Sequence, residues 1–243
     1  MYSRCLGTDE FFSNGGSLSK LDDSTDLFAC LQASMTVPGA TGPPVMIDDC
    51  PHFDAFCTEP LPYRSAVEDG ATHVMVLCSR PEGWQPKTKP GVYEQGIAPL
   101  YFHSNQLPQV SRFFERGGQQ YIYAEDLLTL EEGKRAAWET NGEPIAVPPP
   151  DILYGLDEEH ELIDNTKMKK DRSSWKKAHL LPIKVPSHIP ELPTLEQDQQ
   201  EVLNAVRAGY AAAYDLLVPA LGIQDQMQQQ LPLSGQAIVD LTK

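Results

Sequence analysis

The sequence predicts an α/β fold with a parallel sheet in its first third and a helical, loop-rich second part. A short apolar stretch at 42–47 precedes a helix-like segment at 62–70, and four consecutive apolar residues follow at 74–77. Strand, helix and strand in this order form a βαβ unit, whose two strands lie parallel. An uninterrupted apolar run is typical of a strand that is covered on both faces. Pro is frequent, 21 residues against 17 Gly, and prolines at 144–150 and 182–193 predict loops in the second part.

Start and stop signals bound the first helices. The segment 24–35 begins with residues that can cap a helix, and this helix must end before Pro38, because Pro disfavours helical geometry in the residue before it. Pro62 stands at a helix start and Gly70 at a helix stop, so a short helix is expected between them.

Further helices are expected in the second half of the chain. The sequence patterns predict them over about 107–117, 123–139 and 195–217. The last would open with a capping box made by Thr194 and Gln197. Before it, a segment punctuated by prolines is expected to run extended.

The charge of the chain limits its partners. Lys and Arg total 19 against 34 Asp and Glu, which gives a formal net charge of −15. Such a field repels phosphate groups, so we expect no nucleic-acid partner, whereas neutral or zwitterionic lipid remains compatible. No apolar run approaches the roughly 18 residues of a membrane span, and the first residues do not resemble a signal peptide. We therefore expect a cytoplasmic location, with peripheral contact to membranes or lipid droplets left open.

The cysteines do not form a recognisable framework. They are Cys5, Cys30, Cys50, Cys57 and Cys78. Their odd number and the lack of a C-x-x-C pair argue against a disulfide scaffold or a metal site. We expect buried or partly buried free thiols in a reducing compartment.

The sequence contains no strong candidate for a nucleophile. Ser17 lies in G-G-S-L-S, where Ser19 replaces the last Gly of a G-x-S-x-G turn, and no apolar strand precedes it. Cys50 or Cys57 paired with His52 is an alternative that would make the protein a cysteine-dependent esterase.

No metal or cofactor site is predicted. The pair His160-Glu161 lacks the second His of an H-E-x-x-H motif, and no Gly-rich phosphate loop is present. A basic cluster around Trp175 could touch lipid headgroups, but a solvated loop that neutralises its acidic neighbours is the favoured interpretation. The cluster consists of Lys167, Lys169, Lys170, Arg172, Lys176 and Lys177.

A series of short motifs between residues 27 and 83 carries a resemblance. A helix ends in Ala33-Ser34 and leads to Pro38-Gly39, a P-P-V strand follows, and then come an Asp, a Pro-led helix, a Gly-Ala pair and an apolar strand. This order resembles the C-terminal half of patatin-like phospholipases, which are lipid acyl hydrolases. The resemblance implies part of a three-layer α/β/α sheet in residues 1–90. Residues 91–222 would be a helical and Pro-rich extension packed on it, and 223–243 a flexible Gln-rich tail.

The resemblance also implies a catalytic role for one aspartate. The family uses a Ser-Asp dyad, and its Asp lies between the P-P-V strand and the Pro-led helix, which is the position of Asp54. Asp69, followed by Gly70 and Ala71, is the second choice, because it lies at the end of that helix. Ala55 departs from the Gly that the family usually has after the Asp, and it would be strained if the backbone there had a positive φ.

The serine and the Gly-rich loop of the family belong to a part that would precede residue 1. We therefore expect a fragment of a serine acyl hydrolase that acts on phospholipid or related acyl lipids and that is inactive alone. A non-catalytic α/β module that binds an unknown protein partner is the alternative. A G-x-S-x-G motif in frame upstream would distinguish the two.

Overall fold

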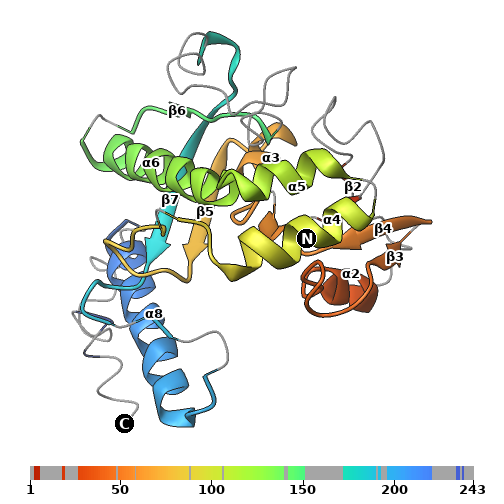
Figure 1. Cartoon of the computed structure of the whole chain (residues 1–243). Coiled ribbons are helices and arrows are strands. Elements are labelled where there is room, and N and C mark those ends of the chain that lie inside the picture. Colours follow the sequence, from red (N-terminus) through yellow and green to blue (C-terminus); the bar gives the residue numbers. More distant parts are fainter. Residues whose placement is uncertain are drawn as a thin grey trace. The chain divides into compact units, whose positions relative to one another are not determined.

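The computed structural model describes most of the chain between residues 27 and 220. The described residues are 3–5, 18–19, 27–47, 49–57, 59–87, 89–105, 107–139, 142–150, 172–189, 191–192, 196–220, 234–235 and 237. They cluster into two compact units (Figure 1). The first combines the described residues of 1–74 and 86–180, and the second those of 75–85 and 181–243. The predicted boundaries at 90 and 222 stay predictions.

The structure contains both helices and sheets, which agrees with the predicted α/β class. The helical elements are α2 (Leu27–Ala33), η1 (Ala55–Cys57), α3 (Tyr63–Glu68), η2 (Tyr93–Ile97), α4 (Ala98–Ser104), α5 (Pro108–Glu115), α6 (Gly118–Glu139), η4 (Arg172–Ser174) and α8 (Gln199–Ala220). The element η2 is one turn of π-helix that continues into α4.

Most of the expected helices are present. Helix α3 begins after Pro62 and is followed by Gly70 at φ +101°, a conformation that glycine adopts without strain. Helix α8 begins later than expected. Asp198 caps it by accepting hydrogen bonds from the N–H groups of Gln200 and Glu201. The predicted capping residue Thr194 lies outside the described residues.

The first sheet is antiparallel and belongs to the first unit. It has the order β2-β1-β4-β3 and is built from β1 (Ser3–Cys5), β2 (Leu18–Ser19), β3 (Val45–Ile47) and β4 (Cys50–Phe53). Strands β3 and β4 form a hairpin, in which Val45 faces His52 and Ile47 faces Cys50. Asp49, at φ 60°, allows the tight reversal between them, because Asp tolerates the left-handed conformation better than most residues.

The predicted βαβ unit is therefore wrong. Strand β3 pairs with its neighbour in the sequence, whereas β5 (His73–Cys78) belongs to a second sheet of order β5-β7-β6. In that sheet β6 (Ile145–Ala146) pairs antiparallel with β7 (Lys177–Lys184). The physical reason is the hairpin turn, which brings β4 beside β3 without a long crossover connection.

Strand β5 is not covered on both faces, contrary to the expectation from its apolar run. It lies at an edge of its sheet, and Met75 and Leu77 are 50% and 72% exposed. Val76, which points to the opposite face, is buried. The apolar run therefore predicted the strand correctly, but not the exposure of one of its two faces.

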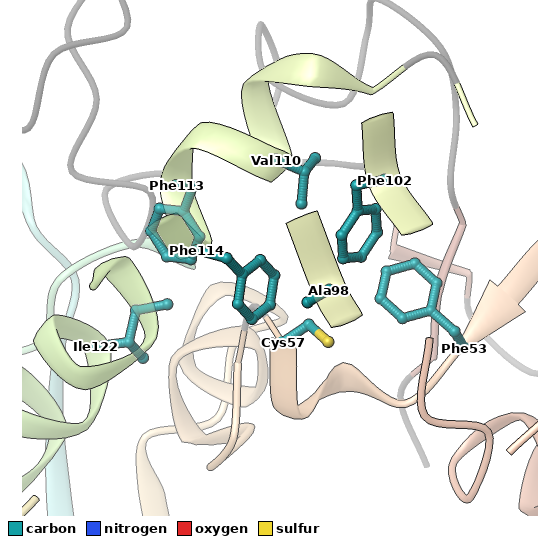
Figure 2. Packing of buried hydrophobic residues seen from close by; sticks show 8 residues of the cluster. All are labelled: Phe53, Cys57, Ala98, Phe102, Val110, Phe113, Phe114 and Ile122. Carbon is teal, nitrogen blue, oxygen red and sulfur yellow. The ribbon is translucent and has the colours of Figure 1, made fainter. Parts of the chain in front are cut away.

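The main apolar core of the first unit joins the end of β4 to helices α4, α5 and α6 (Figure 2). It contains Phe53, Cys57, Ala98, Phe102, Val110, Phe113, Phe114 and Ile122, each at most 2% exposed. The rings of Phe102 and Phe114 stack with centroids 5.6 Å apart, and Phe53 meets Phe102 edge-on at 5.9 Å. This core holds the residues on either side of Asp54, since Phe53 precedes it and Cys57 follows it closely.

Candidate functional site

Asp54 lies at the point where β4 ends and η1 begins. Its backbone N–H donates a hydrogen bond of 2.9 Å to the carbonyl oxygen of Thr36. The N–H of Phe56 donates one of 2.9 Å to the Asp54 Oδ1. The first bond joins the aspartate to the loop that follows α2, and the second fixes its carboxylate at the start of η1. Asp54 is half-buried, so the carboxylate keeps access to solvent.

The residue after Asp54 does not require glycine. Ala55 is the first residue of η1, and Asp49 is the one non-glycine residue with a positive φ in the described part of the chain. The backbone at Ala55 therefore has no left-handed strain, and the departure from the Gly of the patatin-like pattern carries no conformational penalty here.

A loop and a π-helical turn meet beside the aspartate. The Tyr93 hydroxyl of η2 donates a hydrogen bond of 2.9 Å to the carbonyl oxygen of Pro38. Gly39, at φ +74°, approaches so closely that a Cβ there would lie 3.1 Å from both Ile97 Cγ2 and Tyr101 Cβ. Single π-helical turns occur often at functional sites, where they reposition side chains. This one orients Tyr93 toward the segment that anchors Asp54.

Burial governs the protonation of this group of residues. It raises the pKa of the Asp54 carboxyl, and the hydrogen bond from the Phe56 N–H opposes this effect. Burial also raises the pKa of the Cys57 thiol well above its usual value, a hydrogen bond with Tyr93 lowers it, and the Asp54 charge adds to the increase. The pKa of Tyr93 is raised by burial and by Cys57. Cys57 and Tyr93 are therefore neutral at physiological pH.

This arrangement can perform general base chemistry. The Oδ1 of Asp54 is held by Phe56, and none of the described residues forms a hydrogen bond with its Oδ2. A carboxylate with a raised pKa, held by one oxygen and with no partner for the other among the described residues, is suited to accept a proton.

Asp69 has a different setting. It is exposed and caps the C-terminus of α3, where its N–H donates to the carbonyl oxygen of Ser65 at 2.9 Å. Its neighbour Gly70 turns the chain away from the helix. The structure does not bring Asp69 together with Asp54, Cys57 or Tyr93 by any of the contacts described above.

The cysteine-based alternative loses its support. Cys50 is disulfide-bonded, so the expectation of free thiols throughout is wrong for this residue, while Cys30, Cys57 and Cys78 carry free thiols. Cys57 is completely buried and stays protonated, whereas a nucleophilic cysteine needs a lowered pKa. His52 is 1% exposed, and its Nδ1 lies 2.9 Å from the carbonyl oxygen of Cys50.

Several other candidates lie outside the described residues. These are Ser17, His160, Glu161, Lys167, Lys169 and Lys170. Two described members of the basic cluster pair with acidic side chains: Arg172 with Glu132 at 3.4 Å, and Lys176 with Glu68 at 2.9 Å. Within the described part of the chain, no group of His, Cys, Asp or Glu side chains could hold a metal ion.

A buried ionic cluster between α3 and α6 was not predicted from the sequence. The Arg64 Nη2 lies 2.7 Å from the Asp126 Oδ1, and the Tyr63 hydroxyl donates to the same oxygen at 2.9 Å. Glu59 accepts hydrogen bonds from both the N–H and the hydroxyl of Ser65. One signal could have revealed it, since Asp126 lies four residues from Ile122 and Leu130, on the buried face of α6.

Comparisons with known proteins found no relative of this chain. No family model, no curated protein and no solved structure matches the chain. No helix among the described residues combines the length and the apolar character that crossing a membrane requires.

Proposed function

We propose that this chain is part of a patatin-like lipid acyl hydrolase in which Asp54 is the general base. The setting of the Asp54 carboxylate is the observation that carries the proposal. Its Oδ1 is anchored by Phe56, while its Oδ2 has no hydrogen-bond partner among the described residues. Burial raises its pKa, and a general base works best when its pKa approaches the operating pH.

In this mechanism Asp54 accepts the proton of a serine hydroxyl directly. The serine oxygen then attacks the carbonyl carbon of an acyl ester, and the proton passes from Asp54 to the departing alcohol. A water molecule, deprotonated by Asp54, hydrolyses the acyl-enzyme and releases the fatty acid. The substrate class is an acyl lipid such as a phospholipid.

The serine partner is proposed to come from a preceding segment of the complete protein. Strand β5 favours this idea, because it lies at a sheet edge and exposes Met75 and Leu77. Exposed apolar side chains at a sheet edge are suited to pack against further structure. The second candidate is a non-catalytic interaction module, which the exposure of Phe28 (78%) and Met35 (68%) favours as a partner surface.

The first experiment examines the native protein in its source cells. An antibody against residues 100–220 would capture it, and a fluorophosphonate probe would label any activated serine. We expect a labelled band larger than 26.9 kDa. A band at 26.9 kDa that takes up no probe and hydrolyses no lipid would contradict the proposal and favour the interaction module.

The second experiment tests the aspartate. In the complete protein, Asp54→Asn keeps an oxygen for the Phe56 N–H but removes the base, so hydrolysis of a phospholipid should fall about 10²- to 10⁴-fold. Asp69→Asn is the matched control, because it makes the same chemical change at an exposed helix end, and it should retain most of the activity. The reverse ranking would show that Asp54 is not the base.

A further inference from the structure

The second unit contains an open apolar cavity of about 540 Å³ that the proposed hydrolysis does not use. Its apolar lining includes Val185, Ile189 and Leu192, together with Val202, Ala205 and Val206 of α8. Ala205 and Val206 follow Val202 by three and four positions, so all three residues lie on one face of the helix. The volume falls within the range of roughly 300–1,000 Å³ that is usual for sites of small molecules.

The lining is accessible to a ligand. Val202 is 39% exposed and Val206 is 64% exposed, although both are apolar and belong to the cavity wall. An apolar guest would remove this area from water, and each buried CH₂ group contributes about 0.8 kcal/mol.

The lining of the cavity also contains a pair of charged residues. Arg80 and Glu191 both line it, and their side chains form an ion pair. The Arg80 guanidinium also lies over the Trp84 ring, 4.8 Å from its centroid, which holds the cation in place. Glu191 is the carboxylate that pairs with this guanidinium.

Among the described residues that line the cavity, Arg80 carries the only positive charge and Glu191 the only negative one. A guanidinium has five N–H donors, so Arg80 can bind a second carboxylate while Glu191 remains near. Arg80 and Glu191 are 42% and 35% exposed, and exposed ion pairs contribute little, so Glu191 can also yield its place at low cost. The net charge of −15 opposes any anion at long range, but physiological salt screens this repulsion beyond about 8 Å.

We propose that this cavity binds an amphipathic carboxylate, with its hydrocarbon chain against the apolar residues of α8, Val185, Ile189 and Leu192 and its carboxylate on Arg80. The site is independent of Asp54. A fatty acid is the simplest member of this chemical class.

Calorimetric titration of the 243-residue protein with sodium decanoate, below its micelle concentration, tests the proposal. We expect one site. Arg80→Gln should weaken binding about tenfold or more, because a charge-assisted hydrogen bond is lost. Glu191→Gln should strengthen binding several-fold, because it removes the competing carboxylate. Val206→Glu should abolish binding, because it places a charge in the apolar wall.

Arg172→Gln is the matched control. Arg172 also pairs with a glutamate and lies over a tryptophan ring, at 5.4 Å from Trp175, but it does not line the cavity. It should bind decanoate like the wild type. Decyltrimethylammonium and octyl glucoside serve as cationic and neutral probes and should bind at least tenfold more weakly.

Three results would overturn the proposal. They are a wild type that does not bind decanoate, equal binding of the cationic probe, and weaker binding by Glu191→Gln. Circular dichroism would verify the fold of each variant. If Arg80→Gln does not fold, Glu191→Gln decides the outcome, since only competition for Arg80 predicts a gain in affinity.

Discussion

Two aspartates of the first unit are at least partly buried, but only one of them is paired with a cation. Asp54 lies after β4, and Asp126 lies at the contact between α3 and α6. Asp54 is half-buried, and among the described residues no cation pairs with it and no group forms a hydrogen bond with its Oδ2. Asp126 is 1% exposed and shares its Oδ1 with Arg64 and Tyr63. Burial raises the pKa of both carboxyls, that of Asp126 to about 6 although Arg64 opposes it.

The surroundings of an aspartate determine which role its carboxylate can take. An accessible carboxylate with a raised pKa can exchange a proton with a substrate, as a general base must. A carboxylate enclosed with a guanidinium instead fixes two helices against each other, and its removal leaves an uncompensated charge. The buried Asp126 Oδ2 has no hydrogen-bond partner in the part of the chain that the structure describes, so the described contacts leave this oxygen unsatisfied.

The largest expected effect on stability comes from removing the Asp126 carboxylate. Asp126→Ala leaves the buried Arg64 guanidinium without its anion, which should lower the free energy of unfolding by about 3–5 kcal/mol. Urea unfolding followed by circular dichroism measures it. Asp54→Asn is the counterpart and should change stability by less than about 1 kcal/mol, because it keeps the Phe56 hydrogen bond.

The double variant Arg64→Met with Asp126→Leu separates charge from packing. It removes both charges and fills the space with apolar atoms, so it should be more stable than Asp126→Ala. If Asp126→Ala unfolds like the wild type, the ion pair is not what holds α3 to α6.

The raised pKa of Asp126 also predicts how the stability of the protein depends on pH. Asp126 has a pKa of about 6 when folded and an ordinary value of 3.8, so the folded protein binds its proton more tightly. The associated stability is present below about pH 4 and is lost as the pH rises through about 6. By linkage this amounts to about 2–3 kcal/mol.

Urea midpoints of the wild type and of Asp126→Asn, measured between about pH 4 and 7, provide the test. The shift of Asp54 has the same direction and is present in both proteins, so the difference between the two curves reports Asp126. A difference that does not change with pH would refute the raised pKa.

The smallest expected effect concerns the loop that anchors Asp54. Gly39→Ala and Gly142→Ala introduce the same side chain at nearly the same φ, +74° and +72°, so the cost of the left-handed conformation is similar in both. A Cβ at Gly39 meets Ile97 and Tyr101 at 3.1 Å, whereas one at Gly142 meets no atom within 4 Å. Gly39→Ala should therefore be less stable than Gly142→Ala by about 1–2 kcal/mol. Equal melting temperatures would show that the loop can move away from η2.

Sequence reasoning worked where the determining residues are close in the chain. Pro62 and Gly70 bound α3 as expected. It failed for the sheet, because the apolar character of β3 and β5 does not encode which strand each pairs with. The turn at Asp49 decided that pairing for β3.

The net charge and the bounds of α3 follow from the sequence alone, because they depend on composition or on residues a few positions apart. The choice of Asp54 as candidate base rests instead on the resemblance to patatin-like phospholipases and stays a prediction. Only the tertiary structure decided that Arg64 meets Asp126, 62 residues away, and that Tyr93 reaches Pro38, 55 residues away. Such contacts depend on how whole helices pack, and no local pattern specifies a partner at that separation. The burial that raises the pKa values of Asp54 and Asp126 arises from the same packing, so the chemistry of both aspartates became apparent only in the folded chain.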